Sequence, residues 1–392
     1  MSLVRQFAGV TAMNLKSVTQ RPATSSVIVI GIMGVVLVLI SILALGTSLA
    51  ESVRSTGRPD RAIVLRAGTD EEAGSSLFVD EVQTITSAPG IASTAEGSPI
   101  ATADMVTAVQ LPRKKNDSRA GVVIRGMTEH GIAVRPEIRI VEGRWFKPGL
   151  SELVVGRSAQ GEFRGLSVGD KVRLRRGEWT VVGVFESGNG LQGSLLTDAK
   201  TLMSAYLRAQ FSSVTVRLKS PASFDAFKAA LTTNPTLSVN PIREVEHYRR
   251  LSTDVSGPLY LVSFVIGGIM AVGALFAALN TMYTTVSNRR VEIATLRAMG
   301  FGGGCVVASI LAEAMILAAV GGLVGAGIAW LLMSGNTFGL GAKEGSVVAQ
   351  LRVTPALLGI GLAWACAVGF LGGLLPALRA ARMPVAAALK VE

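Results

Sequence analysis

The chain has 392 residues, of which 49% are hydrophobic and 17% are charged, and its mean hydropathy is +0.47. This composition is too apolar for an ordinary soluble enzyme of this size, so it predicts a membrane protein. The net charge of +11 does not indicate a nucleic-acid-binding protein, because only 5% of the residues are aromatic and no basic cluster is interleaved with stacking side chains.

Four apolar stretches are each long enough for a membrane-spanning helix, which needs about 20 apolar residues. We predict spans at residues 22–50, 257–287, 304–333 and 355–377. The first is too long for a cleaved signal peptide, whose apolar core has roughly 7 to 15 residues, and it begins late, after Arg21. The sequence therefore predicts a multi-pass α-helical membrane protein with an uncleaved first span.

Basic residues flank these spans unevenly. Most of them lie on one side, at Arg5, Lys16 and Arg21, at Arg289, Arg290 and Arg297, and at Arg379, Arg382 and Lys390. The short loop on the opposite side, residues 334–354, contains only Lys343 and Arg352. Because Lys and Arg are retained on the cytoplasmic side, we expect the N-terminal segment 1–21, the connection 288–303 and the tail 378–392 to be cytoplasmic.

Residues 51–256, between the first two spans, are predicted to form an extracytoplasmic α+β domain with stalk helices at its ends. The segments "RAIVLRAG", "SELVVG", "GDKVRLRRGEWTVVGVF" and "SSVTVRLK" have the period and β-branched content of strands. The segments "LFVDEVQTITSAP" and "PASFDAFKAALTTNP" are typical of helices. The polar stretch "LPRKKNDSRA", residues 111–120, is predicted to be an exposed loop.

Several chemistries have no support in the sequence. Cys305 and Cys366 both fall in predicted spans, so the external domain has no disulfide. His130 and His247 are far apart and lack ligand-like neighbours, so we expect neither a metal site nor a catalytic triad. No G-x4-G-K-[S/T] loop is present, so this chain is not expected to hydrolyse ATP.

The cytoplasmic connection "NRRVEIATLRAMGF", which begins at Asn288, is predicted to be a short helix. Arg289 and Glu292 are spaced to pair, Ile293 and Leu296 form an apolar edge, and Gly300 is a natural stop. From the residues alone it is either a positively charged anchor at the membrane surface or a docking element for a soluble partner.

Two features of the third span also leave alternatives open. The G-x3-G spacing of Gly321 and Gly325, with Gly322 between them, predicts close helix packing either within one subunit or across a dimer face. Glu313 is the one acidic residue in a predicted span. It is either a structural carboxylate, bonded to a helix end or a basic neighbour, or a proton or substrate site.

The segment "NTMYTTVSNRRVEIATLRAMGF", from Asn280, resembles the signature of the FtsX-like permease family. The matching residues are Arg289, Arg290, Glu292, Ile293, Leu296, Arg297, Ala298, Met299 and Gly300, and Met299 stands where Leu is commoner. The segments "LAEAMILAAVGGLVGAGIAW" and "GGLLPALRAARMPVAAAL" continue the resemblance. The external segments "VEGRWFKPGLSELVVG", "LSVGDKVRLRRGEWTVVGVF" and "VTVRLKSPASFDAFKAAL" are similar to the periplasmic core domain of MacB-type transporters.

This resemblance implies a permease subunit of an ABC transporter in the bacterial inner membrane. Such subunits work as dimers, here either a homodimer or a heterodimer, with two copies of an ATPase. The chain resembles the version without a fused ATPase, so ATP and Mg would be bound by the partner and no cofactor by this chain. The helix from Arg289 to Phe301 would be the ATPase-coupling element.

The family also implies a function and further partners. Its members pass ATP-driven motion to the external domain, and many work with a periplasmic adaptor, or membrane fusion protein, and an outer-membrane channel. The long external domain favours efflux. The alternatives are signalling to a periplasmic cell-wall hydrolase and release of lipoproteins from the inner membrane.

Overall fold

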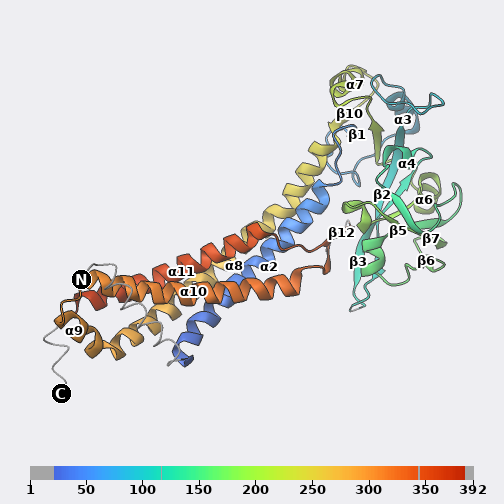
Figure 1. Ribbon diagram of the computed structural model, residues 1–392. Coiled ribbons are helices and arrows are strands. Elements are labelled where there is room, and N and C mark those ends of the chain that lie inside the picture. The colour runs from blue at the N-terminus through green and yellow to red at the C-terminus, as the bar shows by residue number, and fades with distance from the viewer. Residues whose placement is uncertain (1–21, 116, 343–344, 385–392) are drawn as a thin grey trace. The chain divides into compact units, whose positions relative to one another are not determined.

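The computed structural model describes residues 22–115, 117–342 and 345–384 (Figure 1). The described chain divides into two compact units. The helical unit comprises residues 22–46, 258–334 and 352–384, and the sheet unit comprises residues 47–257 and 335–351. The predicted cytoplasmic segment 1–21, and residues 385–392 of the predicted tail 378–392, lie outside the described residues.

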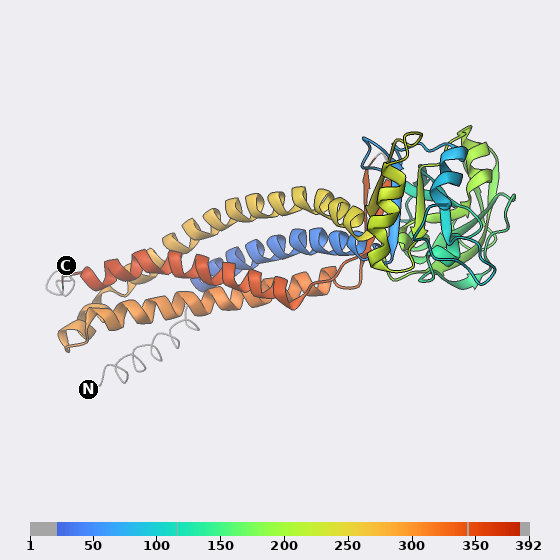
Figure 2. The same ribbon diagram turned by 90° about the horizontal axis from the view of Figure 1, so that it is seen from above.

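Four of the described helices are long and apolar enough to cross a membrane. They are α2 (Pro22–Arg54), α8 (Glu244–Asn288), α10 (Gly303–Met333) and α11 (Pro355–Arg382). In the helical unit these helices run side by side (Figure 2). The short helix α9 (Arg290–Ala298) connects α8 to α10.

The predicted spans fall on these helices, and some of the helices continue beyond the predicted ends of the spans. The fourth helix continues beyond residue 377 to Arg382, because "ALRAAR" consists of good helix formers. The first and second helices extend past the predicted spans, to Arg54 and back to Glu244, and their extra turns belong to the sheet unit.

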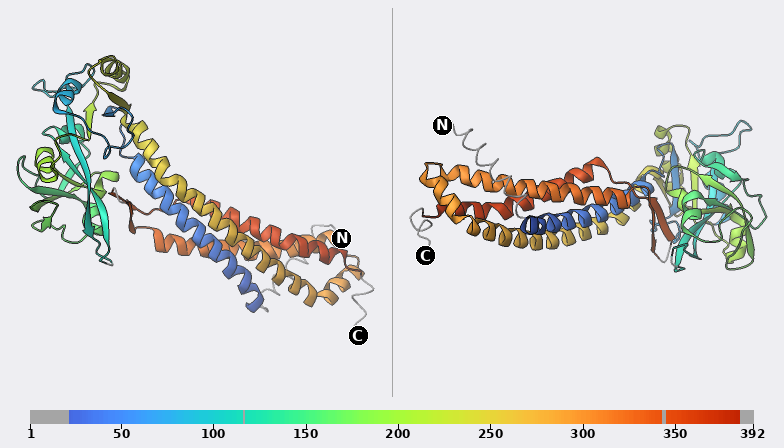
Figure 3. Two further views of the ribbon diagram at one scale, coloured as in Figure 1. Left: turned by 180° about the vertical axis from the view of Figure 1, so that it is seen from behind. Right: turned by 60° about the horizontal axis from the view of Figure 1, so that its bottom comes forward.

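The sheet unit is built on one large, mostly antiparallel sheet (Figure 3). Its strand order is β10-β1-β9-β2-β3-β8-β5-β7-β4, and β6 pairs with β7. The strands are β1 (Arg61–Arg66), β2 (Ala101–Pro112), β3 (Arg119–Met127), β4 (Arg139–Gly143), β5 (Glu152–Gly156), β6 (Lys171–Arg173), β7 (Glu178–Glu186), β8 (Leu195–Asp198), β9 (Ser213–Arg217) and β10 (Val239–Arg243). β3 pairs with β8 and β5 with β7 in parallel.

Short helices complete the sheet unit. They are α3 (Val79–Thr86), α4 (Gly131–Val134), α5 (Arg157–Glu162), α6 (Ala199–Tyr206) and α7 (Phe224–Thr232), with 3-10 turns η1 (Gly190–Gly193) and η2 (Pro221–Ser223). Two buried apolar clusters form most of the core, one around Phe163 and Trp179 and the other around Phe211 and Phe227. The predicted α+β domain is therefore present.

Two segments predicted as loops contain strands. The loop predicted at residues 334–354 contains an antiparallel hairpin, β11 (Thr337–Ala342) and β12 (Gly345–Gln350), whose backbone packs within the sheet unit against β3 and η1. The loop predicted at residues 111–120 is the turn between β2 and β3, and Leu111–Pro112 and Arg119–Ala120 are paired strand residues. Alternation was too weak in both segments to indicate strands.

Candidate functional site

The α9 helix has one buried face and one exposed face. Its N-cap is Arg289, where the backbone leaves the α8 helix, and Gly300 at φ +92° ends it. Ile293 and Ala294 are buried, and Ile293 belongs to an apolar cluster with residues of α8, α10 and α11. The exposed residues are Arg290, Val291, Glu292, Thr295, Ala298, Met299 and Gly300, whereas Leu296, Arg297 and Phe301 are half-buried.

The start of α9 is tied to α10 by a buried ion pair. Arg289 Nη1 lies 3.5 Å from Glu313 Oε2, and both side chains are only 7% exposed. Arg289 Nε also lies 3.0 Å from Glu292 Oε2, whose side chain is 48% exposed. A charge in an apolar environment is costly unless it is paired, so Glu313 and Arg289 stabilise each other. The structure places Glu313 beside a basic neighbour.

The other end of α9 is tied to the end of α11. Arg297 Nη1 donates a hydrogen bond of 2.5 Å to the carbonyl oxygen of Met383, which is the C-cap residue of α11. A guanidinium is favourable there because the last carbonyls of a helix lack intrahelical partners and carry partial negative charge. The α9 helix is therefore bonded to α10 at one end and to α11 at the other.

Gly321, Gly322 and Gly325 of α10 lie against other helices of the same chain. A Cβ at Gly321 would come within 2.7 Å of the Val29 carbonyl oxygen, and one at Gly325 within 2.6 Å of the Met33 carbonyl oxygen. A Cβ at Gly322 would lie 2.7 Å from Ala365 Cβ on α11. Only glycine permits such close approach of the helix backbones.

The sheet unit contains buried charges that were not predicted from the sequence. Arg125 on β3 bonds to Glu72, at 2.5 and 3.0 Å, and to Asp104 on β2, at 2.8 Å. Burial alone would raise the pKa of Glu72, but the charge and hydrogen bonds of Arg125 outweigh this effect and lower that pKa from 4.5 to about 2. The pair is therefore ionised at neutral pH.

A second buried pair joins the first residues of β1 and α8. Arg61 Nε lies 2.6 Å from Glu244 Oε2, and the two side chains are 2% and 1% exposed. Arg61 Nη1 also lies 2.8 Å from Glu137 Oε1. These partners are distant in sequence and no motif connects them, so only the fold reveals the pairs.

Two known families match the chain. The MacB-like periplasmic core domain matches residues 24–234, which is more than half of the chain, and the FtsX-like permease C-terminal domain matches residues 264–385. The crystal structure of the extracellular domain of YknZ from Gram-positive bacteria covers 46% of this chain and 99% of that domain, with a TM-score of 0.36 and 14% sequence identity.

The chain is also similar to curated proteins. YknZ of Bacillus subtilis, named an uncharacterized ABC transporter permease, is 23% identical over 226 residues, which cover 54% of each protein. The macrolide export ATP-binding/permease protein MacB of Nitrobacter winogradskyi is 32% identical over 146 residues, which cover 37% of this chain and 20% of that protein. The pyoverdine export ATP-binding/permease protein PvdT of Pseudomonas syringae is 25% identical over 250 residues, 57% of this chain and 35% of that protein. The chain thus spans about half or less of these relatives.

Proposed function

Because the chain belongs to the MacB-like and FtsX-like family of ABC transporter permeases, we propose that it couples ATP hydrolysis by a separate ATPase to movement of the sheet unit for efflux of a substrate. In this proposal the sheet unit is periplasmic, both termini are cytoplasmic, and the permease works as a dimer in the inner membrane. A periplasmic adaptor and an outer-membrane channel would receive the substrate. ATP and Mg would be bound by the ATPase.

The observation that carries this proposal is the attachment of α9 at both ends. A helix that only marked the cytoplasmic side would need its basic charge and nothing more. The α9 helix instead bonds to α10 through Arg289 and to α11 through Arg297, and it keeps Val291 and Met299 49% and 63% exposed. Two exposed apolar side chains among polar ones, on a firmly held short helix, suit docking of a protein partner.

Motion of a docked ATPase would then reach both α10 and α11 through bonded side chains. It would also reach α8, because Arg289 directly follows the last residue of that helix. At its first residue, α8 holds the buried pair between Glu244 and Arg61. We propose that α8 carries the movement, because a helix is stiff along its axis and is held by a buried ion pair near each end.

Export is favoured over the two alternatives by the relatives. The names of MacB and PvdT describe export of a macrolide and of pyoverdine, and both proteins match this chain over more than a third of its length. Signalling to a cell-wall hydrolase and lipoprotein release have no such support among these named proteins. The substrate of this chain is not assigned.

Co-purification tests the proposal. The tagged permease is isolated from its native membrane in mild detergent, and the associated proteins are identified by mass spectrometry and assayed for ATP hydrolysis. We expect an ABC ATPase and a periplasmic adaptor. The double variant Val291→Asp, Met299→Asp should lose at least nine-tenths of the ATPase while keeping its thermal unfolding midpoint.

The matched control is Leu150→Asp, which places the same charge at a 48% exposed apolar residue of the sheet unit. This variant should retain the ATPase. Recovery of no ATPase with the unaltered permease would overturn the coupling proposal. Recovery of a cell-wall hydrolase in place of an adaptor would overturn the efflux part and support signalling.

A further inference from the structure

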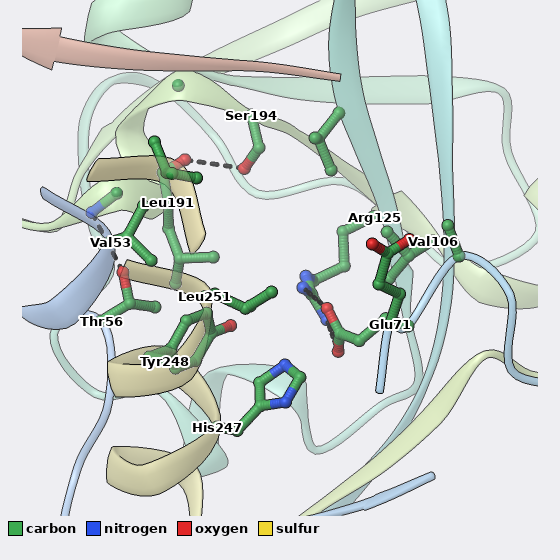
Figure 4. Close-up of a pocket in the computed structure, with 16 residues that line it drawn as sticks. Val53, Thr56, Glu71, Val106, Arg125, Leu191, Ser194, His247, Tyr248 and Leu251 are labelled. Atoms are coloured by element: carbon green, nitrogen blue, oxygen red, sulfur yellow. Dashed lines mark hydrogen bonds and ion pairs between the residues drawn. The ribbon is translucent and has the colours of Figure 1, made fainter. Parts of the chain in front are cut away.

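The sheet unit contains a cavity of about 280 Å³ that takes no part in the coupling site. Six segments line it: the end of α2, the loop after β1, strand β2, strand β3, η1, and the first turns of α8 (Figure 4). All of its lining residues belong to the sheet unit, and those on α8 precede the predicted span. We call it the Arg125 cavity.

Most of the wall of the Arg125 cavity is apolar. Val53 from α2, Val106 from β2, Leu191 from η1 and Leu251 from α8 line it. Small-molecule sites have this character, with a mainly apolar lining and a few polar groups that fix orientation. Glu71, which also lines the cavity, is exposed, so the cavity is open to solvent on that side.

The polar part of the wall includes Arg125 and His247, and each of these residues has a buried nitrogen atom without a hydrogen-bond partner among the described residues. The Nη atoms of Arg125 bond to Glu72 and Asp104, but in the described structure its Nε has no hydrogen-bond partner. His247 is 3% exposed, and its Nε2 is likewise without a partner among the described residues. Figure 4 shows the His247 ring beside the Arg125 side chain.

These unsatisfied nitrogen atoms indicate that the cavity binds a ligand with a polar group. Leaving a buried donor or acceptor unsatisfied costs about 1–3 kcal/mol, so native structures rarely do so without a ligand or ordered water. The terminal torsion of a histidine is soft, so rotation of the His247 ring changes the direction in which its nitrogen atoms face. A molecule with one polar head would satisfy these atoms while its body contacts the apolar wall.

The charged groups that line the cavity favour a ligand whose polar group is uncharged. The charge of Arg125 is matched by Glu72, so no surplus cation is present among the named lining groups to hold an anion. The Nε–H of Arg125 is a donor, so it cannot form a hydrogen bond with an ammonium group, which also has only donors. Burial lowers the pKa of His247, which keeps its ring neutral. A hydroxyl or carbonyl oxygen, which accepts a hydrogen bond without bearing a charge, fits these conditions.

We propose that the Arg125 cavity binds a small uncharged molecule with an apolar body and a hydroxyl or carbonyl head. The guest contacts the ends of α2 and α8 and the sheet at once, so occupancy favours one packing of these elements over others. The binding does not depend on the proposed function. Its effect on ATP-driven movement does.

Three probes with one ring and different heads test the proposal: benzyl alcohol, benzylammonium and benzoate. Binding to the full-length permease in lipid nanodiscs is measured by equilibrium dialysis, with empty nanodiscs subtracted. We expect saturable binding of one benzyl alcohol per chain, and at least tenfold weaker binding of the two charged probes. Val123→Phe, which fills the cavity from β3, should abolish binding, whereas Val168→Phe at an exposed site should not.

His247→Phe keeps a ring of similar size but removes Nε2, so it should weaken benzyl alcohol binding about 2- to 10-fold, as expected for one hydrogen bond. His130→Phe is its matched control and should bind normally. Thermal unfolding of each variant checks that it is folded. Three results would overturn the proposal. The first is no saturable binding above that of empty nanodiscs, which would mean that the cavity holds water only. The second is stronger binding of a charged probe than of benzyl alcohol, and the third is unchanged binding in both folded cavity variants, Val123→Phe and His247→Phe.

Discussion

Replacing Glu313 with alanine removes the buried partner of Arg289. The two side chains are 3.5 Å apart and each is 7% exposed, so the substitution leaves a guanidinium in apolar surroundings. Breaking a buried ion pair in this way typically costs roughly 3–5 kcal/mol of unfolding free energy. Glu292, 3.0 Å from Arg289 Nε, retains part of the compensation. We therefore expect a loss of about 2–3 kcal/mol.

The assay is the free energy of unfolding in mixed micelles, measured by titration with a denaturing detergent. Glu292→Ala removes the exposed member of the same cluster and should cost no more than about 1 kcal/mol. The double variant Arg289→Met, Glu313→Met removes both buried charges and fills the space with apolar atoms. It should recover most of the stability that Glu313→Ala loses.

These values separate a buried ion pair from ordinary packing. Equal losses in Glu313→Ala and in the double methionine variant would mean that the loss of stability does not come from leaving the buried charge of Arg289 without Glu313. No loss in Glu313→Ala would mean that this pair does not hold α9 against α10. Either result would refute the account of how the start of α9 is attached.

Three further predictions concern other parts of the molecule. Gly325→Val should destabilise the helical unit by about 1–3 kcal/mol in the same titration, because its Cβ would meet the Met33 carbonyl at 2.6 Å, whereas Gly327→Val, with open space around it, should not. The pKa of Glu72 is lowered from 4.5 to about 2 on folding. Ionised Glu72 therefore contributes about 3 kcal/mol to the free energy of unfolding above pH 4.5, and this contribution is lost as the pH falls toward 2. Chemical denaturation at several pH values should show that the unfolding free energy falls with pH over this range. Glu72→Gln should make this fall smaller. Leu207 has φ +53° at the end of α6 and is 72% exposed, so Leu207→Asn should raise the unfolding free energy by about 1 kcal/mol in chemical denaturation; a lower value would contradict the reasoning.

The long helices and several strands could be predicted from the sequence because their patterns are local. Uncharged stretches of sufficient length indicated α2, α8, α10 and α11, and β-branched runs indicated β1, β5, β7 and β9. The strands β2 and β3 were missed. Most of β2 is buried, and it includes Asp104 at 0% exposure, so it shows neither alternation nor a continuous apolar run.

The attachment of α9 was predicted only in part. The residues of α9 are adjacent in sequence, but the residues to which they bond lie elsewhere in the chain. The spacing of Arg289 and Glu292 indicated their pair, and a buried carboxylate in the third span required some partner. That this partner is Arg289, and that Arg297 bonds to the Met383 carbonyl, depends on how the helices pack. No periodicity encodes such contacts.

The most direct test of the central claim is photo-crosslinking from the exposed face of α9. A benzophenone amino acid is placed at Thr295, which is exposed, and at Leu150 in the sheet unit as the control, and native membranes are irradiated. The account predicts a crosslink from Thr295, but not from Leu150, to a protein that mass spectrometry identifies as an ABC ATPase. A crosslink from Thr295 to no ATPase, in membranes where the ATPase is present, would contradict the assignment of α9 as the coupling helix.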